Sequence, residues 1–141
     1  MTVYIDSSVL LRVVTAEAGA LRRWREIRRP LSSALIRLEC LRTIDRARIR
    51  LGLPDAEVAD RRAAVLERLA AFELIPIDAA VLDRAAEPFP TLLGSLDAVH
   101  LASALLARRR VPELAFATHD GELATAARAV GFAVLGAPER S

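Results

Sequence analysis

Residues 3–17 of the chain, VYIDSSVLLRVVTAE, carry the pattern that decides the fold. Residues 3–5 form a short β-branched and aromatic run, which is typical of a buried strand. This run ends at Asp6, and the residues that follow place apolar side chains at helical spacing. Either Asp6 or Ser7 is a favourable N-cap for such a helix. The pattern therefore predicts a strand followed directly by a helix, with a carboxylate at the junction.

The same alternation of strand and helix continues along the chain. Further strands are expected at residues 31–33, 74–77, 114–118 and 132–135, and helices at residues 18–29, 34–51, 55–72, 78–87, 95–110 and 121–130. Strands that alternate with helices predict a mostly parallel sheet covered on both faces. We expect one α/β domain over residues 1–141, with ligands bound beyond the carboxyl ends of the strands.

Composition excludes several classes of protein. Apolar residues make up 53% of the 141 residues, which suits a folded domain and excludes a disordered chain. Cys40 is the single cysteine, so no internal disulfide can form, and its apolar neighbours predict a buried thiol. No segment has the length and hydrophobicity of a membrane span or a signal peptide, so we expect a cytoplasmic protein without a membrane partner.

All 20 basic residues are arginine, and the formal net charge is +2. The absence of lysine excludes a P-loop and a receiver-type phosphotransfer site, because both use one. The arginines gather in three clusters, which are Arg22, Arg23, Arg25, Arg28 and Arg29, then Arg42, Arg46, Arg48 and Arg50, and finally Arg108 to Arg110. Two interpretations fit these clusters: surfaces that follow nucleic-acid phosphates, or solvated helix faces.

Four acidic residues are candidates for a functional site. Asp6 and Asp120 each follow a predicted strand, where a carboxylate can be a ligand or a helix N-cap. Glu39 lies at the edge of the apolar face of its helix, and Asp97 lies on a helix that is apolar nearly all round. Both carboxylates are therefore drawn inward, where a buried charge needs a partner.

A divalent metal is the simplest partner for several converging carboxylates, because without one they would repel one another and their pKa values would rise. A set of carboxylates with no paired His or Cys favours Mg²⁺ or Mn²⁺ over Zn²⁺. Mg²⁺ in proteins commonly shares the phosphate oxygens of a substrate. The acids therefore predict phosphodiester hydrolysis.

Five segments together resemble a known family. They are VYIDSS at residues 3–8, SALIRLE at residues 33–39, SLDAVHLA at residues 95–102, ATHDGEL at residues 117–123 and AARAVGF at residues 126–132. In this order they resemble the PIN domain, and within it the VapC-type toxins of VapBC toxin–antitoxin modules. The resemblance covers nearly the whole chain.

The resemblance implies a three-layer α/β/α fold with a mostly parallel five-stranded sheet. It places the metal-binding and catalytic acids at Asp6, Glu39, Asp97 and Asp120, with Ser7 and Thr118 as supporting polar residues. Whether one or two metals bind is left open.

The activity implied is that of an Mg²⁺- or Mn²⁺-dependent endoribonuclease, which cuts structured or single-stranded RNA (tRNA, rRNA or mRNA) and leaves a 5′-phosphate and a 3′-hydroxyl. The partners implied are the RNA substrate, a cognate VapB-type antitoxin and a second copy of the chain in a homodimer.

Other residues leave alternatives open. We expect His100 to be a packed or hydrogen-bonded structural residue rather than a general base, and His119 to be a solvated loop residue rather than an RNA contact. Trp24 fits core packing and a binding surface equally well. The alternative function is a catalytically silent module of the same fold that binds RNA or a protein.

Overall fold

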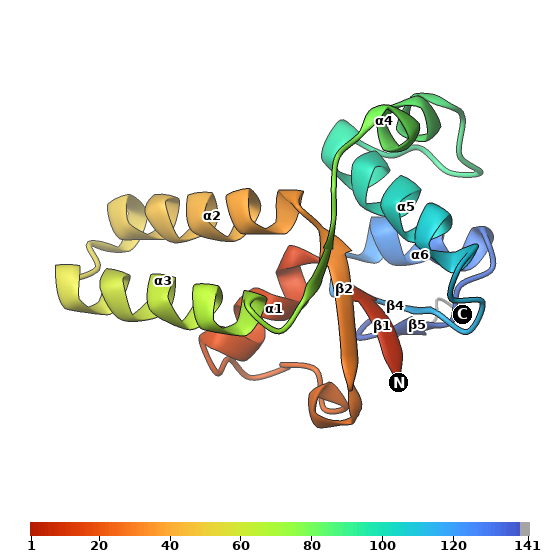
Figure 1. Ribbon diagram of the computed structural model, residues 1–141. Coiled ribbons are helices and arrows are strands. Elements are labelled where there is room, and N and C mark those ends of the chain that lie inside the picture. The colour runs from red at the N-terminus through yellow and green to blue at the C-terminus, as the bar shows by residue number, and fades with distance from the viewer. Residues whose placement is uncertain (139–141) are drawn as a thin grey trace.

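The first strand lies at the centre of a parallel sheet in this computed structural model, which describes residues 1–138 (Figure 1). Within those residues the sheet has five strands, β1 (Thr2–Ile5), β2 (Arg29–Ser33), β3 (Glu73–Ile75), β4 (Ala115–Ala117) and β5 (Val134–Leu135). Their order is β3-β2-β1-β4-β5, and every neighbouring pair is parallel. Parallel neighbours need crossover connections, which the helices supply.

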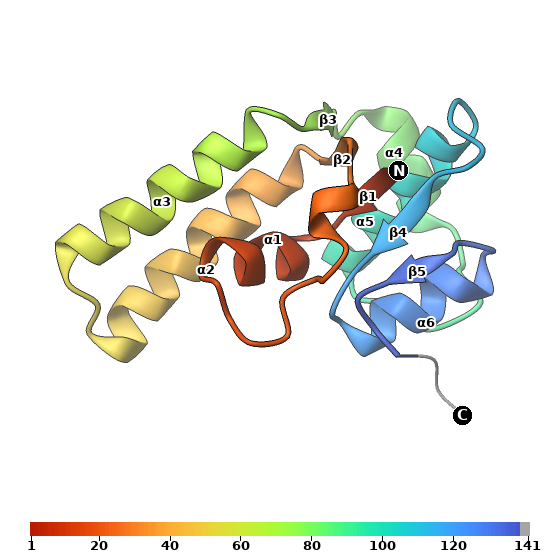
Figure 2. The same cartoon turned by 90° about the horizontal axis from the view of Figure 1, so that it is seen from below.

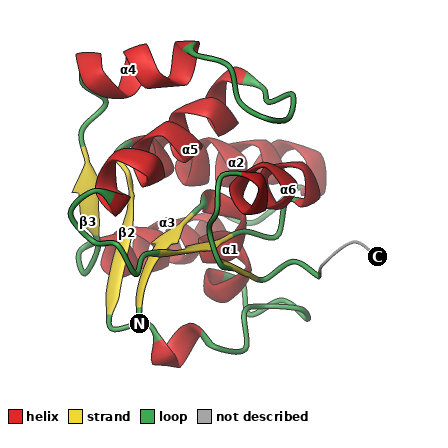
Figure 3. Ribbon diagram, turned by 90° about the vertical axis from the view of Figure 1, so that its right-hand side faces the viewer, coloured by secondary structure: helices red, strands yellow, loops and turns green. Residues whose placement is uncertain are grey.

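Helices cover both faces of the sheet and make the outer two layers (Figures 1 and 3). One face carries α1 (Ser7–Val14), α2 (Leu35–Leu51) and α3 (Asp55–Leu69), and the other carries α5 (Ser95–Arg108) and α6 (Gly121–Ala129). Helix α4 (Ala79–Ala86) packs on α5. The predicted three-layer α/β/α fold is confirmed, and the sheet is parallel throughout.

The two faces of β1 explain why the sheet is buried on both sides. Val3 and Ile5 are fully buried and pack with Val9 of α1 on one face. Tyr4 points to the other face, where it packs with Phe116 of β4 and with the apolar residues of α5 and α6. Successive residues of a strand face opposite sides, so a run of three apolar residues anchors both layers.

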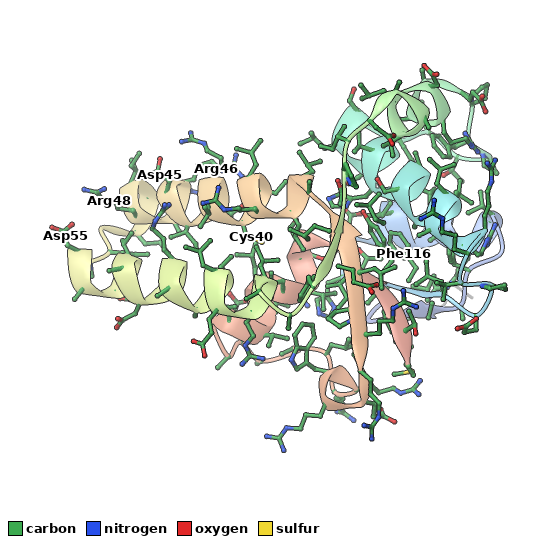
Figure 4. The ribbon with its side chains drawn as sticks, in the orientation of Figure 1. Cys40, Asp45, Arg46, Arg48, Asp55 and Phe116 are labelled. Carbon is green, nitrogen blue, oxygen red and sulfur yellow. The ribbon has the colours of Figure 1, made fainter. Side chains whose placement is uncertain are left out.

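Helices α2 and α3 form a long antiparallel pair that projects from the sheet (Figures 1 and 2). Buried residues join this projecting arm to α1, and they are Leu10, Ile36, Cys40, Ile44, Val65 and Leu69. Figure 4 shows Cys40 between the two helices, and burial raises the pKa of its thiol to about 12. Cys40 is therefore the buried core thiol that the sequence predicts.

The predicted helix at residues 18–29 is wrong. This segment contains turns and a single short 3₁₀ helix, Trp24–Glu26, before β2 begins at Arg29. Leu21, Trp24 and Ile27 pack against one face of the sheet at a spacing of three residues, which suits tight turns better than an α-helix. Trp24 is thus partly buried in the core, with its ring tilted by 35° to that of Phe72 at a centroid distance of 6.4 Å, which agrees with the packing interpretation.

Most other predicted elements are present with ends shifted by a few residues. Gly52 follows α2 in the left-handed conformation, so this helix ends where the range 34–51 predicts, and Gly94 is the N-cap of α5. Within residues 1–138, no helix is both long and apolar enough to cross a membrane.

Gly136 is expected to be far less tolerant of substitution than Gly52, although both have positive φ angles, +91° and +62°. A Cβ at Gly136 would lie 2.8 Å from the Thr118 carbonyl oxygen, whereas a Cβ at Gly52 meets nothing within 4 Å. We expect Gly52→Ala to cost about 1 kcal/mol of unfolding free energy and Gly136→Ala at least about 1 kcal/mol more. Urea unfolding of both variants measures the difference, and equal losses would contradict the packing described here.

Candidate active site

Asp6 is the most buried of the four candidate acids, with 4% of its surface exposed. It is the N-cap of α1, and its Oδ1 accepts hydrogen bonds from Ser8 Oγ at 2.6 Å and from the Val9 backbone N–H at 3.2 Å. Its Oδ2 accepts from Thr118 Oγ1 at 2.5 Å. Burial raises the pKa of Asp6, although the hydrogen bonds from Ser8 and Thr118 oppose this rise. The carboxylate is therefore held by donors from the first turn of α1 and from the end of β4.

The pairing of β1 with β4 brings Thr118 to Asp6. Ile5 lies opposite Ala117 in this parallel pair, so the next residues of both strands emerge at the same edge of the sheet. Thr118 is fully buried, and its Oγ1 also accepts a hydrogen bond from the backbone N–H of Asp120 at 3.0 Å. One hydroxyl therefore joins the two acidic loops.

Asp120 is exposed at the start of α6 and is the N-cap of that helix. Its Oδ1 accepts from the backbone N–H groups of Glu122 and Leu123, at 2.9 and 3.2 Å. The capping role that the sequence allowed for Asp6 and Asp120 is thus present for both residues. In Asp120 it uses Oδ1 and leaves Oδ2 available to a ligand.

Asp97 lies in the first turn of α5 and is half-buried. Burial, with a further contribution from the charge of Asp120, raises its pKa to about 6. The charges of Asp6 and Glu39 act in the same direction, while His100 opposes them. The four acids are therefore close enough for their charges to interact, although they come from four separate segments of the chain.

Glu39 approaches this group from α2, with 17% of its side chain exposed. Its Oε1 makes a close contact with Nε2 of His100, whose Nδ1 lies 2.7 Å from the hydroxyl of Tyr4. His100 is 1% exposed, so it is a buried hydrogen-bonded residue, in agreement with the sequence-based expectation. The sequence did not predict that Tyr4 and Glu39 are the hydrogen-bond partners of His100.

The supporting polar residues differ in part from those expected. Ser8, rather than Ser7, donates to Asp6, and Ser8 Oγ also accepts from the backbone N–H of His119 at 3.0 Å. Ser7 instead lines a cavity of about 460 Å³ beside Glu39. A hydroxyl two residues after a capping Asp is the signal that could have identified Ser8.

His119 is partly buried rather than solvated, which corrects the expectation for this residue. Its Nδ1 lies 2.7 Å from the carbonyl oxygen of Gly136, while its backbone N–H bonds Ser8. The Nδ1–H tautomer satisfies that carbonyl. His119 therefore fixes the loop between β4 and α6 against β5.

The donor chemistry of the four acids fits a hard divalent cation. Within residues 1–138 no arginine forms an ion pair with Asp6, Glu39, Asp97 or Asp120. In the same described part of the chain, no three His, Cys, Asp or Glu side chains are grouped closely enough to enclose an ion. Asp6 and Asp120 turn oxygens toward helix N-termini, and Glu39 turns one toward His100. Carboxylates without a cationic partner are the ligands that Mg²⁺ and Mn²⁺ prefer.

Comparisons with known proteins agree with this architecture. The PIN domain family model matches residues 3–129. Ribonuclease VapC46 of Mycobacterium tuberculosis is 36% identical over 137 residues, covering 94% of this chain and 95% of its own, and Ribonuclease VapC35 of the same organism is 37% identical over 138 residues, with the same coverage. The crystal structure of PAE2754 from Pyrobaculum aerophilum shares the fold, with a TM-score of 0.61 at 21% identity over 95% of this chain and 83% of that one.

The raised pKa of Asp97 predicts a stability that depends on pH in metal-free protein. A carboxyl whose pKa is about 6 when folded and about 4 when unfolded binds its proton more tightly in the folded state, so its ionisation destabilises the fold above about pH 6. This penalty disappears as pH falls from about 6 to about 4. We expect Asp97→Asn to raise the melting temperature in EDTA at about pH 7.5, and to change it little at about pH 4.5.

Thermal unfolding followed by circular dichroism measures this difference. Asp83→Asn removes the same charge from an exposed position on α4 and serves as the control. An Asp97→Asn variant that is no more stable than wild type at about pH 7.5 would show that the ionised carboxylate carries no penalty in the fold.

Proposed function

The chain belongs to the PIN-domain family, and from this membership we propose that it is a metal-dependent ribonuclease toxin of the VapC type. The observation that carries the proposal is that four carboxylates from four segments lie close enough for the charges of the other three to act on Asp97, with no arginine paired to any of them in residues 1–138. Residues 1–141 act as one domain in this proposal. A cytoplasmic location is part of the same proposal, because an RNA substrate would be met there.

We propose that Asp6, Glu39, Asp97 and Asp120 hold Mg²⁺, with Mn²⁺ as a substitute. Bound metal supplies Lewis-acid chemistry for in-line hydrolysis of a phosphodiester, which leaves a 5′-phosphate and a 3′-hydroxyl. The residues around the acids hold them in place for this role. Ser8 and Thr118 fix Asp6, and Thr118 ties the Asp120 loop to the same point.

A cationic surface lies next to these acids. The cavity of about 460 Å³ beside Glu39 is also lined by Arg42 and Arg46, which lie one turn apart on α2. Both arginines are exposed and make only surface contacts, Arg42 with Asp45 and Arg46 with Thr43. Guanidinium groups in this position can bind phosphates of the RNA on the path to the acids.

The remaining partners rest on the likeness to the VapC relatives. We propose a cognate VapB-type antitoxin that blocks access to the four acids, and a homodimer as the free form. The alternative is a module of the same fold that binds RNA or a protein without cutting it. It predicts RNA binding that is independent of all four carboxylates.

The proposal predicts cleavage of cellular RNA that requires divalent metal. Purified protein is expected to produce discrete fragments from total RNA with Mg²⁺ or Mn²⁺, and none with EDTA. Asp6→Asn and Asp97→Asn keep the shape of each side chain and remove a charged ligand, so each should lower the cleavage rate by at least about 100-fold. Gel electrophoresis and fragment sequencing measure the rate and identify the cut sites.

Asp83→Asn is the matched control, because Asp83 is exposed on α4 and is not one of the four acids. It should cleave at the wild-type rate. If folded wild-type protein binds metal and RNA but cuts nothing, the catalytically silent module becomes the better explanation.

The arginines beside Glu39 predict a salt-dependent contact with RNA. If each holds one phosphate, the double variant Arg42→Gln and Arg46→Gln should reduce the slope of log affinity against log salt by roughly 1.4 for a single strand, and it should raise KM with little change in kcat. Fluorescence anisotropy at several salt concentrations measures the slope. Arg50→Gln with Arg62→Gln removes two exposed charges outside the cavity, and an equal effect there would exclude a specific role for Arg42 and Arg46.

A further inference from the structure

A chain of buried hydrogen bonds leads from β2 to Glu39. The backbone N–H of Ser33 donates to the Tyr4 hydroxyl at 3.0 Å, and this hydroxyl lies 2.7 Å from Nδ1 of His100. Nε2 of His100 then contacts Oε1 of Glu39. We propose that His100 is a positioning residue that orients Glu39 toward the metal, and that Tyr4 selects the His100 tautomer that can do so. This inference rests on the proposed function, in which Glu39 is a metal ligand.

The direction of each hydrogen bond follows from its neighbours. A carboxylate oxygen accepts, so Nε2 of His100 donates to Oε1 of Glu39. In the proposed tautomer this N–H is the only one of the ring, and Nδ1 accepts from the Tyr4 hydroxyl. The Tyr4 oxygen in turn accepts from the backbone N–H of Ser33. Every group in the chain then has a hydrogen-bond partner.

The surroundings hold this chain in one arrangement. Tyr4 is fully buried, its ring stacks on Phe116 with centroids 5.1 Å apart, and it meets the His100 ring edge-on at 5.8 Å. Burial also raises the pKa of the Tyr4 hydroxyl above its ordinary value, so the hydroxyl keeps its proton and remains a donor. Neither ring can turn without losing packing in the core of the sheet.

The consequence for Glu39 is a fixed orientation. A glutamate side chain that makes no contacts has several rotamers, and restricting it to one of them costs conformational entropy. The hydrogen bond from His100 occupies Oε1 and leaves Oε2 as the oxygen for a metal. Residues that hold ligands in this way commonly contribute 10- to 100-fold to metal affinity.

Two substitutions at His100 separate positioning from packing. His100→Gln places an amide N–H near the position of Nε2, so it can still donate to Glu39. His100→Asn is shorter, so it reaches only the position of Nδ1 and loses the contact with Glu39. Calorimetric titration with Mn²⁺ should show a loss of affinity of about 10- to 100-fold for His100→Asn, with most of the affinity kept by His100→Gln.

Thermal unfolding of wild type and both variants in EDTA shows whether each variant is folded and how stable it is. Equal Mn²⁺ affinity in wild type and a folded His100→Asn would overturn the proposal, and so would equal losses in both folded variants. RNA cleavage is measured separately: a wild type that binds Mn²⁺ without cutting RNA contradicts the proposed function, while the affinity comparison still tests the role of His100. A wild type that binds neither Mn²⁺ nor Mg²⁺ overturns both.

The tautomer of His100 can also be measured directly in the wild-type protein, so this test does not depend on the folding of a variant. Long-range ¹H–¹⁵N correlation spectra distinguish the two nitrogens of His100. In metal-free protein at about pH 8 we expect a proton on Nε2 and none on Nδ1. A proton on Nδ1 would overturn the assignment.

Discussion

The buried carboxylate of Asp6 is the constraint on which the rest of the site depends. A charge with 4% exposure is tolerated only where several donors surround it, and here Ser8, Val9 and Thr118 provide them. These donors come from the first turn of α1 and from the end of β4. Satisfying one carboxylate therefore fixes how helix, central strand and neighbouring strand meet, and it places Asp120 beside them.

Local sequence patterns were sufficient to predict most of the strands and helices. Short apolar runs and helix caps gave the strands and helices, because a parallel sheet buried on both sides leaves continuous hydrophobic segments. The segment from Leu21 to Ile27 was assigned wrongly, since its arginines and apolar residues suit a basic helix as well as turns packed on a sheet. Contacts with β1, which lie outside the segment, decide between the two.

The candidate site was predictable to a similar degree. Each acid stood out through its own position, at a strand end or on an apolar helix face, so no long-range information was required. The residues that hold the acids were harder to find: Ser8 was passed over for Ser7, and the link from Tyr4 through His100 to Glu39 joins side chains 96 and 61 positions apart. Such pairs become visible only after the strands are placed side by side.

The position of β1 between β2 and β4 has a consequence for synthesis of the protein. Its pairing with β2 needs residues about one fifth of the way along the chain, but Ile5 meets Ala117 only after most of the polypeptide has left the ribosome. Until then Asp6 has no Thr118 donor and no neighbouring Asp120. A nascent chain of this protein is thus without the complete set of acids while its own messenger RNA is being translated.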